Sequence, residues 1–101
     1  MKNYTIIWYF DVWWSEGEGW WVNDQTIIQH KMDIPDDITP KHLLELIHNI
    51  TLRDIIGREY RAINSTDLRH YKVEDYGEGW EIYETDKEHH EPRPVIGIKL
   101  N

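Results

Sequence analysis

The residues able to bind a metal or carry out acid–base chemistry include six histidines, but their spacing does not predict a site. His42 and His48 are six positions apart, whereas side chains on one helix face lie three or four apart. His89 and His90 are adjacent and point oppositely in an extended chain. We therefore predict no metal. A site that joins His70, His89 or His90 to carboxylates stays open.

Catalytic patterns are also missing from the sequence. With no cysteine, the chain lacks a thiolate nucleophile, a disulfide framework and a thiolate metal site. Its two serines, Ser15 and Ser65, stand in polar stretches without the motif of a nucleophile elbow. No glycine-rich phosphate loop precedes the expected helix, which begins with Thr39-Pro40. We predict a protein that is not an enzyme and has no cofactor.

Aromatic residues give a stronger signal than titratable ones. Five of the six tryptophans precede position 22. Trp8 and Trp14 fall on the apolar face of the first expected strand, where burial explains them. Tyr9 and Trp13 fall on the other face, and Trp21 across the turn can join them. Exposed aromatic patches usually mark an interaction surface, but a second packed layer or a homodimer would also bury them.

Acidic residues dominate the charge, which is −8 overall. Direct binding of nucleic acid is a poor match for such a chain, because phosphate contacts supply most non-specific affinity. The segment from position 74 to position 91 contains eight acidic residues and one lysine. They either form a solvated face or an acidic surface that occupies the nucleic-acid groove of a basic protein partner. We assign candidate acidic contacts to Glu18, Glu74, Asp75, Glu78, Glu81 and Glu84.

Two copies of the tetrapeptide Gly-Glu-Gly-Trp, Gly17–Trp20 and Gly77–Trp80, organise the strands around them. Each copy separates two strand-like stretches, which predicts two hairpins; whether they arose by duplication stays open. The first hairpin would join a strand over Tyr4–Trp14 to one from Trp20 to about Ile34. The second would join Leu68–Asp75 to Trp80–Thr85.

Between the hairpins the sequence predicts one helix. Thr39-Pro40 combines a capping hydroxyl with a proline in the first turn, and the apolar stripe ends near Asn49. A short helical turn from Thr51 to Ile56 and a minor strand near Tyr60 would follow. A loop over Asp86–Pro94 then leads to a last strand, Val95–Leu100.

The expected fold is a single α+β domain over residues 1–101. One antiparallel sheet of about five strands carries one helix packed on one face, in the order ββαβββ. No apolar stretch approaches the length of a membrane helix, and the first residues lack a secretory pattern. We therefore expect a cytoplasmic protein and no membrane partner.

The layout resembles small accessory proteins that bacteriophages and other mobile elements encode, a group with no assigned activity. The features that carry the resemblance are the aromatic first strand, Trp21-Val22-Asn23-Asp24, Ile34-Pro35-Asp36-Asp37 before the helix, and Pro94-Val95-Ile96. The resemblance implies a bacterial host cytoplasm and a role in conflict or host takeover.

The first functional hypothesis is a non-enzymatic module that binds, and thereby inhibits, a basic host protein involved in defence or nucleic-acid binding. One alternative is a small-molecule binder with an aromatic pocket between sheet and helix. Another is a structural homo-oligomer that buries its second aromatic face against itself.

Overall fold

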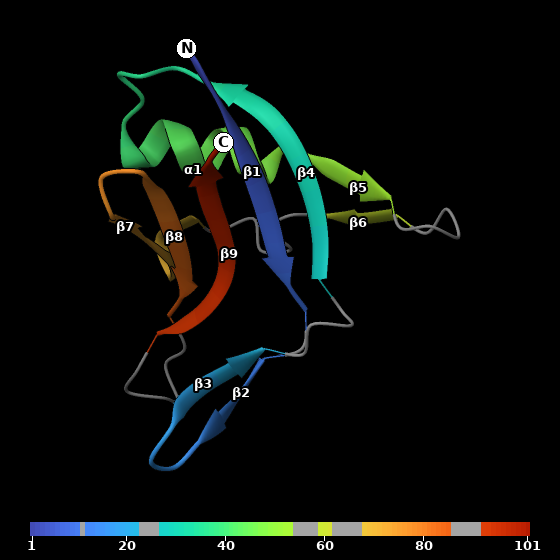
Figure 1. Cartoon of the computed structure of the whole chain (residues 1–101), viewed down its shortest axis with the longest axis vertical. Helices are drawn as coiled ribbons and strands as arrows, with labels where there is room; N and C mark the ends of the chain where they lie inside the picture. Colours follow the sequence, from blue (N-terminus) through green and yellow to red (C-terminus); the bar gives the residue numbers. More distant parts are fainter. Residues whose placement is uncertain (11, 23–26, 54–58, 62–67, 86–91) are drawn as a thin grey trace.

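The centre of the molecule is an antiparallel five-stranded sheet with the strand order β4-β1-β9-β8-β7 (Figure 1). The structure is a computed structural model and describes residues 1–10, 12–22, 27–53, 59–61, 68–85 and 92–101. The strands of the sheet are β1 (Lys2–Tyr9), β4 (Ile27–Ile34), β7 (Tyr71–Asp75), β8 (Gly79–Glu84) and β9 (Arg93–Leu100). The predicted α+β fold with one five-stranded sheet is confirmed.

Smaller elements complete the described part of the chain. Two two-stranded sheets pair β2 (Val12–Ser15) with β3 (Gly19–Val22), and β5 (Thr51–Arg53) with β6 (Glu59–Arg61). A 3-10 helix, η2 (Leu68–His70), precedes β7. The α-helix of the described residues is α1 (Pro40–His48), which lies behind the main sheet in Figure 1. It is not long and apolar enough to cross a membrane.

Helix α1 starts and ends where its sequence predicts. The Thr39 hydroxyl accepts a hydrogen bond from the His42 backbone N–H at 3.3 Å, and Pro40 follows with a backbone already restricted to helical φ. Asn49 forms the C-terminal cap, and its backbone N–H donates to the Ile47 carbonyl. Helical spacing brings Leu43 and Ile47 to one buried face. The helix therefore fixes one apolar stripe against the sheet.

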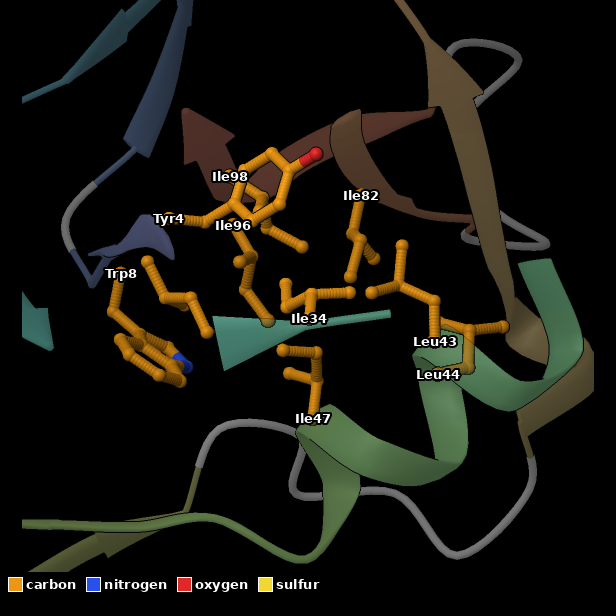
Figure 2. Close-up of a cluster of buried hydrophobic side chains, with 10 residues drawn as sticks. Tyr4, Trp8, Ile34, Leu43, Leu44, Ile47, Ile82, Ile96 and Ile98 are labelled. Carbon is orange, nitrogen blue, oxygen red and sulfur yellow. The ribbon is translucent and has the colours of Figure 1, made fainter. Parts of the chain in front are cut away.

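The core lies between α1 and one face of the main sheet. Alternation along β1 buries Tyr4, Ile6 and Trp8, and Trp8 is only 2% exposed. Figure 2 shows Leu43 and Ile47 pointing from α1 toward side chains of the sheet. The buried core consists of Tyr4, Ile6, Trp8, Ile34, Leu43, Leu44, Ile47, Ile82, Ile96 and Ile98. These side chains fill the space between helix and sheet.

The first hairpin differs from the predicted one because its strands leave the main sheet. The predicted strand Tyr4–Trp14 is two strands, since β1 ends at Tyr9 and β2 pairs only with β3 among the described strands. Trp14, predicted to be buried, is 51% exposed. The predicted strand from Trp20 likewise divides into β3 and β4. Alternation persists across the break, so the pattern could not locate it.

Of three smaller predictions, one is confirmed and two are wrong in part. Thr51–Arg53 forms strand β5 rather than the predicted helical turn, while β6 confirms the minor strand near Tyr60. The last strand begins at Arg93, so Pro94 belongs to β9 and not to a loop. It stands opposite Tyr83, beside a register shift where its missing N–H is tolerated. Residues 86–91 of the predicted loop lie outside the described part.

The two Gly-Glu-Gly-Trp copies both lie at hairpins, as predicted, but they adopt different conformations. In the first copy Gly17 and Gly19 have φ values of 90° and 86°, which only glycine adopts readily. In the second copy Gly77 has a φ of 84°, whereas Gly79 is an extended, buried residue of β8. The repeated sequence therefore serves two different turns.

Candidate functional site: tyrosines and carboxylates on the sheet face opposite the helix

The face of the main sheet opposite α1 carries a cluster of phenols and carboxylates. Alternation along β8 turns Trp80 and Ile82 toward the core, so Glu81 and Tyr83 lie on the opposite face. Glu74 of β7 stands directly across from Glu81 in the strand register. We call the following set the tyrosine face: Tyr9, Glu74, Tyr76, Glu81 and Tyr83.

A chain of hydrogen bonds orders one side of this face. Lys72 Nζ lies 2.9 Å from Glu74 Oε1, and Tyr76 donates its phenolic hydrogen to Glu74 Oε2 at 2.9 Å. The phenol oxygens of Tyr76 and Tyr83 are 3.1 Å apart. Because the single hydrogen of Tyr76 is already donated to Glu74, Tyr83 is the donor to Tyr76. The order of donation thus runs from Tyr83 through Tyr76 to Glu74.

Tyr9 reaches the same face from β1. A Cβ atom added at Gly97 of β9 would lie 2.5 Å from the Tyr9 phenol oxygen, so this side chain extends across the glycine. Gly97 is also the register partner of Glu81 on β8. Burial raises the pKa of the Tyr9 phenol, and the charge of Glu81 raises it further. Residues from three strands therefore meet around Glu81.

The charge of Glu81 acts on all three phenols of the face. Burial and the hydrogen bond to Tyr76 are the main causes that raise the pKa of Tyr83, and Glu81 adds to them. For Tyr76 the hydrogen bond from Tyr83 lowers the pKa, but the bond to Glu74, burial and both carboxylate charges outweigh it. All three phenols consequently remain neutral at physiological pH.

The two carboxylates of the face differ in their partners. A hydrogen bond from Lys72, and to a smaller extent one from Tyr76, lowers the pKa of Glu74. The negative charge of Glu74 is therefore balanced by Lys72. Glu81 is half-buried, and no lysine, arginine or histidine of the described residues lies within ion-pairing distance of it. A partly desolvated charge without a counter-charge favours binding of a cation.

Of the nine predicted contact residues, the structure brings Tyr9, Glu74 and Glu81 together on the tyrosine face. Glu84 at the end of β8 is bonded instead to Arg93, at 2.8 Å. Asp75 accepts a hydrogen bond from the Gly77 backbone at 2.7 Å and thereby shapes the second turn. These two acids have structural partners that the sequence did not indicate.

The other predicted acids lie at the tips of hairpins. Glu18 and Glu78 are exposed residues of the first and second turns, and each belongs to a different sheet. Conversely, Tyr76 and Tyr83 of the tyrosine face were not among the predicted contact residues. The odd-numbered alternation of Glu81 and Tyr83 along the predicted strand Trp80–Thr85 was the signal that could have identified the latter.

A second surface is the tryptophan hairpin, formed by Trp13, Trp14, Trp20 and Trp21 on β2 and β3. Trp13 stands directly opposite Trp21, and these two side chains are 47% and 44% exposed. The rings of Trp14 and Trp20 make an edge-to-face contact with centroids 5.2 Å apart. The hairpin extends beyond the end of the main sheet (Figure 1). Tyr9 and Trp13 were predicted to share one face of a single strand, but they lie on different strands, β1 and β2.

Metal binding finds no geometric support in the described residues, where no three histidine or acidic side chains gather around one point. His89 and His90 lie outside the described part, so a metal site that joins them to carboxylates stays an open alternative. Comparison of the chain with protein-family models, curated proteins and solved structures finds no match.

Proposed function

We propose that this chain is a non-enzymatic protein-binding module for a basic protein. The observation that carries the proposal is Glu81, a half-buried carboxylate that lies among three phenols and has no described cation partner. A basic side chain placed there would offset the charge and cover the aromatic rings. The net charge of −8 would speed the encounter with such a partner and orient it.

The tryptophan hairpin would add apolar contact area beside the tyrosine face. Trp13 and Trp21 are large side chains that remain substantially exposed, and tryptophan is enriched among the residues that dominate binding energy. Strand β2 also contacts β9, the strand that carries Gly97 beneath Tyr9. A folded partner could thus contact the acidic face and the hairpin together.

The resemblance to accessory proteins of bacteriophages and mobile elements supplies the biological setting of the proposal. In the cytoplasm of a bacterial host, the module would bind a nucleic-acid-binding or defence protein stoichiometrically. Its acids would occupy the basic surface that the host protein offers to phosphates. Inhibition would follow from competition for that surface.

The tryptophan hairpin also supports one alternative, a homo-oligomer that buries Trp13 and Trp21 against a second copy. Light scattering at low protein concentration separates the two functions, because self-association would raise the measured mass. The small-molecule alternative requires a pocket between sheet and helix, where the described side chains form a buried hydrophobic cluster.

Binding of polylysine, a basic probe without defined structure, tests the proposal. We expect a complex whose affinity falls as salt rises, because screening weakens exposed charge interactions. Glu74→Gln combined with Glu81→Gln should weaken it more than Asp37→Asn combined with Glu45→Gln, a control that removes the same charge beside and on α1. Absence of binding, or binding that salt does not affect, would contradict the proposed function.

A further inference from the structure

Glu81 has acceptor sites that its neighbours do not fill. The phenolic hydrogens of Tyr76 and Tyr83 are committed to Glu74 and Tyr76 respectively, so neither is available to the Glu81 carboxylate. No described lysine or arginine forms an ion pair with it. The carboxylate therefore offers both oxygens to a ligand that carries several donors.

Neutral phenols lie beside Glu81, while the charge of Glu74, directly across on β7, is balanced by Lys72. Gly97, the register partner of Glu81 on β9, has no side chain, and the Tyr9 side chain extends across that position. Tyr83 lies two residues farther along the same strand and therefore on the same face. A ligand that reaches Glu81 would thus contact aromatic rings as well as a carboxylate.

We infer that the tyrosine face recognises an arginine side chain of the basic partner, with the guanidinium group at Glu81 and against the rings of Tyr9 and Tyr83. A guanidinium is planar, has five donor N–H groups and no acceptor, and stacks on aromatic faces. It matches a carboxylate with two open oxygens between rings. This inference rests on the proposed function and names the side chain that the same face selects.

Lysine matches the same surface less well. Its ammonium group is a compact charge that is hydrated more strongly than a guanidinium, and it lacks a flat surface to lay on a phenol ring. Exposed acids elsewhere, such as Glu45 of α1, attract either cation through their charge. Selectivity for arginine should therefore belong to Glu81 and its phenols, and not to the overall charge.

The test compares two peptides of equal length and charge, one of alternating arginine and glycine and one of alternating lysine and glycine. We expect the wild-type protein to bind the arginine peptide more tightly. Glu81→Gln should weaken this complex by about tenfold or more, since a hydrogen bond to a charged group contributes that much. Glu45→Gln, which removes an equal charge from α1, should leave the preference for arginine intact.

Tyr9→Leu provides a second variant that keeps the carboxylate and removes a ring. It should reduce arginine binding more than lysine binding, and circular dichroism would verify that the fold is retained. Equal affinity for both peptides would overturn the arginine assignment while leaving the proposed function standing. Failure of both peptides to bind would contradict both proposals.

Two further outcomes would also overturn the inference. If Glu45→Gln and Glu81→Gln weakened binding equally, the interaction would depend on the overall charge alone. If light scattering showed a dimer that Glu81→Gln dissociates, the face would belong to a second copy of this chain.

Discussion

Gly79 offers a substitution whose effect follows directly from the geometry of β8 and β9. A Cβ atom added there would overlap the carbonyl oxygen of Ile98 and lie 3.1 Å from its carbonyl carbon. These are backbone atoms within the sheet, and they cannot rotate away as a side chain can. In Gly79→Ala, β8 and β9 must therefore separate. The separation would weaken the hydrogen bond that the Leu100 backbone N–H donates to the Glu78 carbonyl at 3.0 Å.

The expected magnitude combines three effects. Overpacking costs about 1–3 kcal/mol, and a weakened hydrogen bond costs about 1 kcal/mol. Alanine also lowers the conformational entropy of the unfolded chain relative to glycine, which stabilises the fold by about 0.4–1 kcal/mol. Gly79→Ala should then lower the free energy of unfolding by about 2 kcal/mol, or the Tm by about 8–16 °C for a domain of this size.

Gly97→Ala is the matched control for this prediction. Its added Cβ meets the phenol oxygen of Tyr9 at 2.5 Å, which is the free end of a side chain and can move. The stability change should stay within about 1 kcal/mol in either direction. Urea denaturation followed by tryptophan fluorescence measures both variants. Equal losses, or an unchanged Gly79→Ala protein, would refute the packing of β8 on β9 described above.

Two further predictions concern α1 and the tyrosine face. Thr39→Ala removes the hydroxyl that accepts a hydrogen bond from the His42 N–H and should lower the free energy of unfolding, measured by urea denaturation, by about 1 kcal/mol. Thr39→Ser keeps a hydroxyl and should retain most of that free energy. The pKa of Tyr83 is raised above its ordinary value of 10.0, so the stability that it contributes is present below pH 10 and is lost as the pH rises further. Alkaline unfolding should therefore be less steep with pH for Tyr83→Phe than for the wild type; parallel curves would contradict the raised pKa.

The fold was largely predictable because its main signals are local. The helix was defined by the Thr39-Pro40 start and a stripe that includes Leu43 and Ile47, and the structure agrees at both ends. Hairpin positions followed from glycines able to take positive φ. The departure of the chain from the main sheet after Tyr9 was not predictable, because which strand pairs with which depends on long-range contacts.

The candidate site was predictable only in part, and for the same reason. Tyr9, Glu74 and Glu81 are separated by up to 72 positions in the chain, and only the order β1-β9-β8-β7 brings them to one face. Composition indicated acids and aromatics as contacts but could not distinguish Glu81 from Glu84, which pairs with Arg93. Charge density alone does not say which acids already have partners.

An NMR titration with the arginine–glycine peptide tests the central claim most directly, because it locates the contact residue by residue. The tyrosine face predicts shifts in the ring signals of Tyr9 and Tyr83 and in the backbone amide of Glu81. The indole N–H signals of Trp13 and Trp21 should stay nearly unchanged with so short a ligand. Shifts confined to those indoles, with the tyrosine signals unmoved, would contradict the account.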